Sequence, residues 1–477
     1  MSIADSIVPG YPEVTAIIED DVLVKTFHTV LFAPQIWRSE ATDTMPLEPN
    51  YGVSRTHTRN GRMAVNERPA VAGVDPVPKN FGTEQWTTKV RPYQDGLDIH
   101  LTVDKTAAAS TFLQRIMTLG INAGETIDRL PRNALFSSYG TGHALVDVGV
   151  VAGTSFTVSS IAGFTQQIGA DGILAAVSAS NPKQWYLNPT PGATPQVATI
   201  IGATPADPDV PLGRGTITTS ANVTVATHDV IRAYDAPVIL RVGDGASVDA
   251  ITTANQLRLQ DIRRASSILS DNWIPKHTDG YYHCHLPSTV NANLFNDSEL
   301  QALNDGRFGD APYRNLMLGV LFNCLFYENA EVPRLGNVTT PDDALQQSRP
   351  TNATAAYLAP LIGIEMINRF GVPIMRVIIT GGGAMVECPT ETFPTTPELG
   401  WAGVMTSFRP ITSNTIQANT MGIKLILAAP VDRLGQIVRA TWAWGGDFGI
   451  PSDALGGRTN ARFKRAIVIE CADPTYT

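Results

Sequence analysis

The spacing of apolar residues between positions 113 and 134 predicts one long helix. Small and apolar side chains recur there at alternating intervals of three and four residues, which keeps them on one face of an α-helix. The helix would begin at Asp104, a suitable N-cap, and end before Gly140, so its length would be roughly 50 Å. Its single buried seam would consist of Leu113, Ile116, Gly120, Ala123, Ile127, Leu130 and Ala134. The polar residues between them predict exposed faces that carry Gln114, Arg115, Glu125, Asp128, Arg129 and Arg132.

Two turn signals precede this helix and predict extended hairpins. Asn60-Gly61 separates the extended runs 54–59 and 62–65, and an Asn-Gly pair suits a type I′ turn because both central residues need positive φ. The first hairpin has few apolar residues, so it should project from the fold and contact the surface of a partner. Asp95-Gly96 predicts a second turn, before a strand whose apolar residues are Leu97, Ile99, Leu101 and Val103.

The segments at the beginning and after the helix have different patterns. Residues 1–48 show no sustained helical or strand period and mix prolines with acidic and apolar pieces, which predicts an arm that lies on another surface. Between 141 and 235, Gly, Ser, Thr and Pro dominate, and the only basic residues are Lys183, Arg214 and Arg232. Short β-like runs separated by Pro- and Gly-rich loops predict a small all-β insertion there.

After the insertion the pattern alternates between helix and strand. From about Thr253 a helix is predicted, with Arg258, Arg263 and Arg264 on one side and an inward face of Leu259, Ile262, Ala265 and Leu269. Further helices are predicted at 298–304 and 355–369, and strands at 279–287, 372–379, 423–427, 437–444 and 466–471. The chain is therefore predicted to be an α+β protein with an inserted β module.

Composition narrows the class of protein. The 477 residues are 43% hydrophobic and 17% charged, which allows two to four folded domains. The net charge of −9 argues against tight binding to a phosphate backbone, which needs a concentrated Lys/Arg surface. No secretory signal or membrane span is visible, so we expect synthesis in the cytoplasm. Reduced, buried thiols are expected at the widely spaced Cys284, Cys324, Cys388 and Cys471.

Motifs that resemble catalytic or metal sites are interpreted as structural. The run Asp447-Phe448-Gly449 matches the metal-binding tripeptide of protein kinases but lacks their other motifs. The run 381–383, Gly-Gly-Gly, lacks the Lys-Ser/Thr of a phosphate loop, which favours a tight turn. His283 and His285 would share one face of a strand, with Cys284 on the other, without a third ligand at a metal-site spacing. The sequence therefore predicts no active site, no cofactor and no metal.

The arginines around the first hairpin have two interpretations. They could bind nucleic acid, but the segment lacks interleaved aromatic residues, so a solvated or intersubunit face is favoured. The residues expected at such an intersubunit contact are Arg55, Arg59, Asn60, Gly61, Arg62 and Arg68.

The order of these elements resembles the major capsid proteins of tailed bacteriophages, which have the Hong Kong 97-like fold. Residues 112–135 resemble the spine helix of one phage coat subfamily. Residues 265–300 are similar to the same subfamily in their succession of a helix, Asn272, Pro275, Asp279 to Tyr282, Leu286-Pro287 and Asn293-Leu294. The resemblance implies an arm at 1–48, an extended loop at 49–104, the spine helix of the peripheral domain at 105–140, an inserted β domain at 141–235, more of the peripheral domain at 236–299, the axial domain at 300–413, and the peripheral sheet with the C-terminus at 414–477.

The resemblance also implies a function. The chain would be a coat protein without enzymatic activity that assembles with itself, through hexamers and pentamers, into an icosahedral shell of the virion. The shell would enclose double-stranded DNA without sequence-specific binding, with portal and scaffold or decoration proteins as partners and no membrane. Two alternatives stay open: a nanocompartment shell that loads an enzyme, although such shells usually lack a large β insertion, and a carbohydrate-active enzyme that stacks sugars on Tyr281, Trp401, Trp442 and Trp444.

Overall fold

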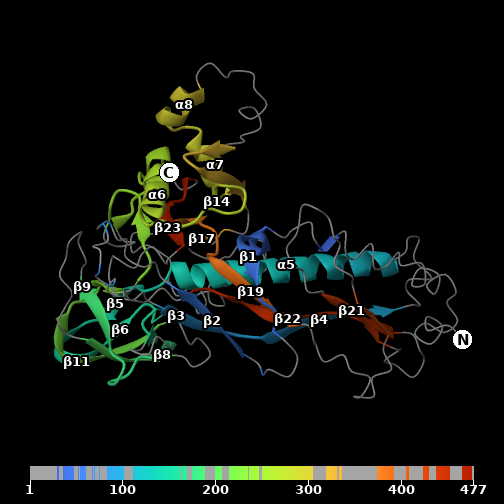
Figure 1. Ribbon diagram of the computed structural model, residues 1–477, viewed down its shortest axis with the longest axis horizontal. Helices are drawn as coiled ribbons and strands as arrows, with labels where there is room; N and C mark the ends of the chain where they lie inside the picture. The colour runs from blue at the N-terminus through green and yellow to red at the C-terminus, as the bar shows by residue number, and fades with distance from the viewer. Residues whose placement is uncertain are drawn as a thin grey trace, which may run out of the picture. The chain divides into compact units, whose positions relative to one another are not determined.

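The computed structural model of the chain (Figure 1) divides into two compact units. Unit 1 comprises residues 1–55, 87–132 and 385–449, and unit 2 comprises residues 56–86, 133–384 and 450–477. The structure describes residues 30–31, 36–47, 52, 54–60, 67, 69, 73, 75, 83–100, 111–161, 163–168, 174–187, 199–206, 214–234, 236–245, 250–304, 319–329, 332, 334–335, 372, 374–390, 404–407, 423–428, 437–451 and 465–474.

Unit 1 is built on a six-stranded mixed sheet. Its strands are β1 (Ala41–Thr44), β4 (Arg91–His100), β19 (Met385–Pro389), β20 (Val404–Ser407), β21 (Lys424–Ala428) and β22 (Ile437–Gly449). β1 runs parallel to β19, and the other pairs are antiparallel. β22 is the central strand, because it pairs with β4, β19 and β21.

β4 corrects the prediction of a turn at Asp95-Gly96. The strand continues through both residues, and all ten of its residues pair with β22 without a break. Gly96 lies opposite Thr441, and a Cβ atom at position 96 would lie only 2.8 Å from the Thr441 Oγ1 atom. The glycine therefore permits close packing inside the sheet, because the pairing with β22 outweighs the local turn propensity.

The predicted long helix is α5 (Thr111–Tyr139), whose 29 residues correspond to about 43 Å. It ends at the predicted place, where the Gly140 N–H donates to the Phe136 carbonyl at 3.0 Å. In unit 1 the helix lies alongside β19 and β22 (Figure 1), and the Trp442 Nε1–H of β22 donates to Asn122 Oδ1 at 2.9 Å. The predicted N-cap, Asp104, lies outside the described residues.

Part of the predicted arm belongs to unit 1. A 3-10 helix, η1 (Trp37–Glu40), leads directly into β1, which pairs with β19. The Trp37 side chain is fully buried. Within residues 37–47 the chain therefore packs on its own unit, because Trp37, Ala41 and Leu47 are buried and β1 extends the sheet. An arm at 1–48 that lies on another surface stays a prediction. Residues 1–29, 32–35 and 48 lie outside the described residues.

The strands β2 (Ser54–Asn60) and β3 (Thr83–Lys89) form a separate two-stranded sheet, called the ribbon below. β2 ends at Asn60, the first residue of the predicted Asn-Gly turn, and it pairs with β3. The predicted second strand of a local hairpin, residues 62–65, lies outside the described residues. The rings of His57 and Trp86 stack across the ribbon with centroids 5.5 Å apart, and both side chains are buried.

Unit 2 contains a closed barrel of six strands. In order around the barrel they are β10 (Thr199–Pro205), β11 (Gly215–Val225), β6 (Val150–Val158), β5 (His143–Val148), β12 (Val230–Ala233) and β9 (Lys183–Leu187). Large apolar side chains such as Phe156, Trp185 and Ile217 fill its interior. A small two-stranded sheet, β7 (Gln166–Ile168) with β8 (Leu174–Ala176), follows β6 in the sequence. The barrel occupies the segment in which the sequence predicts an all-β insertion.

A seven-stranded sheet is the second large β structure of unit 2. Its strands are β13 (Ile239–Arg241), β14 (Tyr282–Leu286), β15 (Val320–Leu321), β16 (Cys324–Glu328), β17 (Arg334–Leu335), β18 (Ile374–Thr380) and β23 (Ala466–Ala472). They follow the order β13, β23, β18, β14, β16, β15, with β17 also paired to β18. β14, β18 and β23 are buried along their whole length. This sheet is therefore the centre of unit 2's second core.

Three helices share the core on one face of this sheet: α6 (Leu259–Asp271), α7 (Ser288–Leu294) and α8 (Ser298–Asn304). The inward face of α6 is confirmed, since the structure buries Leu259, Ile262, Ala265 and Leu269. α8 has the predicted bounds, and β14 lies at the predicted buried strand. The sequence pattern does not predict α7, and the helix predicted at 355–369 lies outside the described residues.

The boundaries of the two units do not coincide with those of the segments that the resemblance implies. β18 comes from the expected axial segment and β23 from the expected C-terminal peripheral segment, yet they pair within one sheet of unit 2. β19 and β22 come from the same two segments and pair within unit 1. The assignment of the seven segments to peripheral and axial domains stays a prediction.

Candidate functional site

The tripeptide Asp447-Phe448-Gly449 lies at the end of β22 and pairs with β19. Phe448 is buried, and its N–H donates to Asp447 Oδ1 at 2.8 Å. Burial raises the pKa of the Asp447 carboxyl above its usual value. A paired strand differs from the loop in which the kinase tripeptide holds its metal, so the position supports a chance match.

The three glycines 381–383 form the tight turn that the sequence predicts, directly after the buried strand β18. The Gly381 N–H donates to the Arg465 carbonyl at 2.7 Å, and the Gly382 N–H donates to the Pro275 carbonyl at 2.8 Å. A Cβ atom at position 382 would lie 2.5 Å from the Lys276 carbonyl oxygen. The glycines therefore serve close backbone packing in unit 2.

Three histidines of unit 2 gather at β14. His283 and His285 share one face of the strand, as predicted, and the ring of Tyr327 lies 5.0 and 5.3 Å from theirs. The His277 ring stacks on His283 at 3.8 Å, and His283 Nε2 lies 2.9 Å from Asp279 Oδ2. Burial alone would raise the pKa of Asp279, but hydrogen bonds from the backbone and from His283 lower it overall. Asp279 is a carboxylate neighbour that the sequence spacing does not reveal.

All four cysteines are buried free thiols, as predicted. Burial raises the pKa of Cys324 and of Cys388 to about 11, and it raises the pKa of Cys284 and Cys471 as well. The thiolate is the reactive form of cysteine, so these side chains are unreactive at neutral pH.

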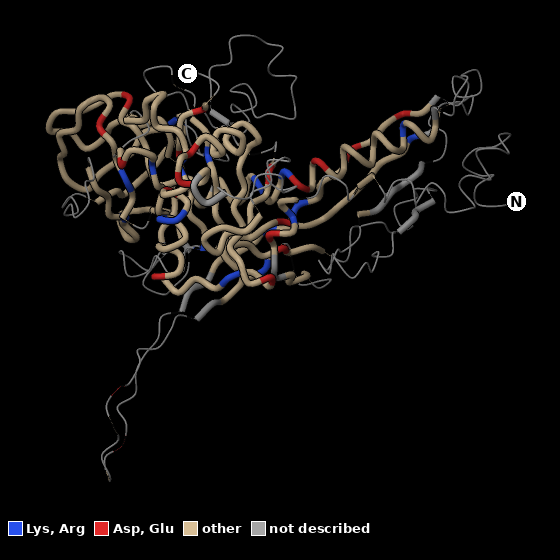
Figure 2. The backbone as a smooth tube through the Cα atoms, turned by 90° about the horizontal axis from the view of Figure 1, so that it is seen from above, with Lys and Arg blue, Asp and Glu red and all other residues tan. Residues whose placement is uncertain are grey.

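The seam expected on α5 is buried in its middle part. The structure buries Ile116, Gly120, Ala123 and Ile127, whereas intermediate exposure is found at Leu113, Leu130 and Ala134. Buried apolar positions outside the expected seam are Phe112, Leu119, Leu135, Phe136 and Tyr139. Acidic and basic residues recur along the same helix (Figure 2).

Asp128 and Arg132 correct the prediction of an exposed polar face on α5, because they are only 4% and 2% exposed. Asp128 Oδ1 accepts hydrogen bonds from the N–H groups of Trp37 and Arg38 at 2.6 and 3.2 Å. A carboxylate is buried at low cost only where donors meet it. The donors come from a segment about ninety residues away, so no local pattern indicates them.

The Arg38 side chain completes a buried polar network in unit 1. Its Nη2 lies 2.6 Å from Oε1 of Glu387 in β19, and its Nε lies 3.3 Å from Oε2. Arg38 and Glu387 are 2% and 1% exposed. The guanidinium also lies 5.9 Å from the centroid of the Trp444 ring. Arg38, Asp128 and Glu387, called the clasp below, connect η1, α5 and β19.

Unit 2 holds a buried ionic ladder across three strands. Glu470 of β23 lies opposite Arg376 of β18 and Arg241 of β13. Arg376 Nη2 lies 2.7 Å from Glu470 Oε1, and Arg241 Nε lies 2.8 Å from Oε2. Burial alone would raise the pKa of Glu470, but the two positive charges outweigh it and hold the pKa below its usual value. The carboxylate therefore stays charged and joins the strands.

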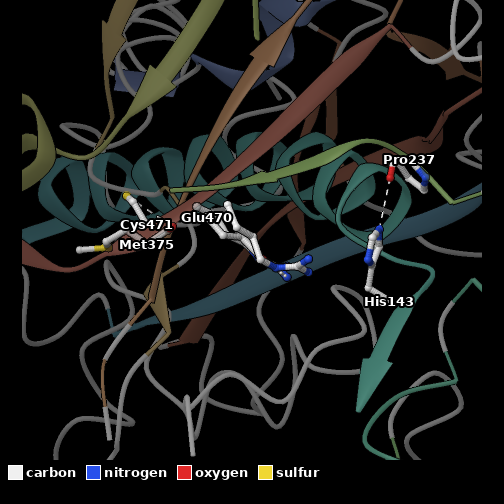
Figure 3. Close-up of polar contacts among 7 residues, drawn as sticks. His143, Pro237, Met375, Glu470 and Cys471 are labelled. Atoms are coloured by element: carbon white, nitrogen blue, oxygen red, sulfur yellow. Dashed lines mark hydrogen bonds and ion pairs between the residues drawn. The ribbon is translucent and has the colours of Figure 1, made fainter. Parts of the chain in front are cut away.

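His143 lies close to this ladder, at the start of β5, and points at the Pro237 carbonyl 3.3 Å away (Figure 3). Because a carbonyl only accepts, His143 Nε2 carries the proton. Burial and the charge of Arg241 lower the pKa of His143 to about 3. The ring is therefore neutral at physiological pH, and it connects the two chain segments that enter and leave the barrel.

The residues expected at an intersubunit contact fall on and beyond the ribbon. Arg55 is half-buried and donates a hydrogen bond to the Pro46 carbonyl. Arg59 and Asn60 are the last two residues of β2. The other three expected residues, Gly61, Arg62 and Arg68, lie outside the described residues. A contact between subunits at these positions stays a prediction.

Among the described residues, no helix has the length and apolar character that a membrane crossing needs. No protein-family model matches the chain, and no curated protein matches it.

Phage capsids are among the solved structures that are similar to the chain. The capsid of Ralstonia phage GP4 matches with 12% sequence identity and a TM-score of 0.46, over 91% of this chain and 88% of that chain. The capsid of the cyanophage P-SCSP1u matches with 9% identity and a TM-score of 0.44, over 92% and 88%. The cyanophage Pam1 capsid matches with 9% identity and a TM-score of 0.44, over 89% and 86%. Because these TM-scores are below 0.5, the likenesses do not by themselves decide what the chain does.

Proposed function

We propose that this chain is the major coat protein of a tailed double-stranded DNA bacteriophage. It would assemble with itself, through hexamers and pentamers, into an icosahedral shell around the genome. It would be made in the host cytoplasm and end in the virion. Its role would be structural, without catalysis, cofactor or metal.

The observation that carries this proposal is the ribbon. Among the described strands, β2 and β3 pair only with each other. The buried pair His57 and Trp86 fixes the two strands, whereas Thr56, Thr58 and Thr87 are exposed. A sheet of two strands is only marginally stable in water and gains stability when it packs on another surface. One face of the ribbon, with His57, Trp86 and Thr88, is already buried in the single chain. In a shell, a neighbouring copy of the same chain would cover the opposite face, which carries the three exposed threonines.

Weak contacts are sufficient for such an assembly. A contact between exposed polar groups contributes only about 0–1 kcal/mol. When every subunit makes the same contact around a closed ring, the later contacts form at high effective concentration. The free energy of assembly of the ring is then much more favourable than that of one pair. A ribbon with few apolar residues can therefore hold a shell together without making the free subunit aggregate.

The clasp supports a rigid subunit of the kind a shell needs. It joins η1, α5 and β19 through charged hydrogen bonds that are almost fully buried. Such bonds are strong and directional, so the three elements of unit 1 should keep their geometry when neighbours pull on them.

The negative charge of the chain suits a shell that encloses DNA without binding it tightly. The net charge is −9, and DNA is strongly held only where Lys and Arg are concentrated. An acidic wall allows the genome to move during filling and release. Portal and scaffold or decoration proteins would be the further partners.

A charge reversal on the ribbon tests this proposal. We expect the variant Arg59→Glu/Arg62→Glu to fold like the wild type but to lose assembly, which sedimentation velocity of the purified chain measures. The matched control is Arg263→Glu/Arg264→Glu, which changes the same charge on exposed positions of α6. A wild-type chain that stays monomeric under all assembly conditions, scaffold present, would contradict the proposal.

The two alternatives differ in their observable consequences. A nanocompartment shell would co-purify with an enzyme cargo and without DNA, and the barrel disfavours it because such shells usually lack a large β insertion. A sugar-binding enzyme needs accessible aromatic rings, but Trp442 and Trp444 are each only 1% exposed. Trp401 lies outside the described residues. Among the other three expected rings, Tyr281 is the exposed one, with an exposed fraction of 36%.

A further inference from the structure

One end of the barrel presents apolar side chains to solvent. It is formed by residues 148–154, around the β5–β6 turn, and residues 220–228, at the end of β11, and is called the barrel tip below. Val151 is 84% exposed, more than any other large apolar side chain among the described residues, and Val148 is 56% exposed. Isolated exposed apolar residues are common, but these two lie within four consecutive positions at the same connection between β5 and β6.

The tip is a tightly built structure. The Gly149 N–H donates to Thr227 Oγ1 at 3.3 Å, and the Ala152 N–H donates to Thr224 Oγ1 at 3.2 Å, so the two parts of the tip are joined by hydrogen bonds. The Ala226 N–H donates to Asp229 Oδ2 at 2.8 Å and closes the second turn. The backbone on both sides of Val150 and Val151 is therefore fixed by hydrogen bonds.

Two residues of the tip have a backbone conformation that side chains disfavour. Ala152 has φ 52° and His228 has φ 71°, both in the left-handed region. Gly149 and Gly153 are tightly enclosed, since a Cβ atom at either position would lie 2.3 Å from a neighbouring atom. Backbone strain of this kind persists where the surrounding structure enforces it, often at binding sites.

The charge around the tip indicates which partner fits it. Residues 148–154 and 220–228 contain no Asp, Glu, Lys or Arg, although the whole chain has a net charge of −9. Two carboxylates flank the tip. Asp147 is paired with Arg214, whose Nε lies 2.8 Å from Asp147 Oδ2, and the half-buried Asp229 accepts the Ala226 N–H. Two copies of an acidic chain repel each other over most of their surfaces, so an uncharged apolar patch is where they can touch. A lipid surface fits less well, because interfacial segments carry Lys and Arg beside their apolar residues.

We propose that the barrel tip is a contact surface for a second copy of this chain, with Val148 and Val151 at its centre. This inference rests on the proposed function, because it names a second place, besides the ribbon, at which the copies meet. Apolar side chains in the centre of an interface dominate binding, and each contact is repeated for every subunit of a closed assembly.

Charge insertion at the tip tests this contact. We expect Val151→Asp and Val148→Asp each to lower the fraction of chain that sediments as oligomers or particles by at least about tenfold, the effect of about 1.4 kcal/mol. The melting temperature should not change, because both side chains are largely exposed in the subunit. The matched control is Gln184→Glu, which adds the same charge at an exposed position of barrel strand β9 and should assemble like the wild type.

A photo-crosslinker separates this inference from the proposed function. With benzophenone-alanine at position 151 of the purified full chain, we expect chain-to-chain products on irradiation, and far fewer with the crosslinker at position 184. Normal particles from Val151→Asp together with no chain-to-chain product from position 151 would overturn the tip contact and leave the proposed function intact. A wild-type chain without any self-association would overturn both. Binding to phosphatidylcholine vesicles that Val151→Asp abolishes, without chain-to-chain products, would assign the tip to lipid and overturn the inference.

Discussion

Replacing Glu387 by glutamine tests the clasp of unit 1. The substitution keeps the size of the side chain but removes the negative charge that faces Arg38, whose Nη2 lies 2.6 Å from Glu387 Oε1. Because the two side chains are only 2% and 1% exposed, the guanidinium would stay buried without the carboxylate that it contacts directly. Breaking a buried pair in this way destabilises a protein by about 3–5 kcal/mol. The total stability of a domain is only about 5–15 kcal/mol, so the effect should be large.

The matched control breaks an exposed ion pair in the same unit. Arg439 Nε and Nη2 donate to the two carboxylate oxygens of Asp98 at 2.6 and 2.9 Å, but these side chains are 50% and 43% exposed. Solvent screens such a pair, so Arg439→Gln should unfold close to the wild type. Urea unfolding followed by tryptophan fluorescence measures both variants, because unit 1 contains the buried Trp37, Trp442 and Trp444.

A double variant shows whether the unpaired charge is the cause. Arg38→Met/Glu387→Met removes both charges and keeps apolar volume, so it should recover part of the stability that Glu387→Gln loses. Equal urea midpoints for Glu387→Gln and Arg439→Gln would refute the reasoning. So would a double variant that is less stable than Glu387→Gln.

Three further outcomes are expected. The pKa of His143 is lowered to about 3, so between pH 6.5 and 3 the unfolded chain binds a proton that the folded chain does not. The free energy of unfolding should therefore fall with falling pH, by up to about 1.4 kcal/mol per pH unit. His143→Gln should flatten this dependence in urea titrations at several pH values. An equal slope in the variant and the wild type would contradict the role of His143. Ile127→Asp should abolish folding of unit 1, measured by circular dichroism, because Ile127 is fully buried, whereas Ile121→Asp, at a side chain that is 44% exposed, should fold. Gly61→Val should reduce assembly in sedimentation runs more than it reduces stability, and equal loss of both would contradict a projecting loop.

Local patterns predict the elements whose residues determine their own conformation. The inward face of α6 and the bounds of α8 follow from helical spacing, and the buried strands β14 and β18 follow from apolar runs. The turn at 381–383 follows from glycine, since side chains would collide with the adjacent backbone. In these cases the local preference and the tertiary structure agree.

The same rules fail where a distant partner decides. Asp95-Gly96 has the composition of a turn, but ten consecutive pairings with β22 keep it in a strand. Asp128 has the spacing of an exposed residue, but the backbone of Trp37 and Arg38 meets it inside unit 1. Neither partner is near in the sequence, so no pattern within the segment could indicate it.

The ionic ladder of unit 2 is an intermediate case. Glu470 stands alone in the apolar run Ala466–Ala472, and Arg376 stands alone in Ile374–Thr380. Single opposite charges inside two buried strands indicate that the strands pair, because each charge needs a partner. The register that joins them, and the contribution of Arg241, require the structure.

The barrel tip shows the limit of sequence reasoning for function. The valines at 148 and 151 look like ordinary strand residues, and only the exposed fractions distinguish them from the barrel core. The proposed contact with a second copy rests on the exposure of these side chains and on the absence of charged residues within the tip. The ribbon is similar, because its isolation from the other sheets is visible only in the strand pairing.

Electron microscopy of the purified full-length chain tests the central claim most directly. We expect closed shells, or rings of five and six copies that close into shells when scaffold protein is added. A uniform population of compact single chains at every concentration, with and without scaffold, would contradict the account.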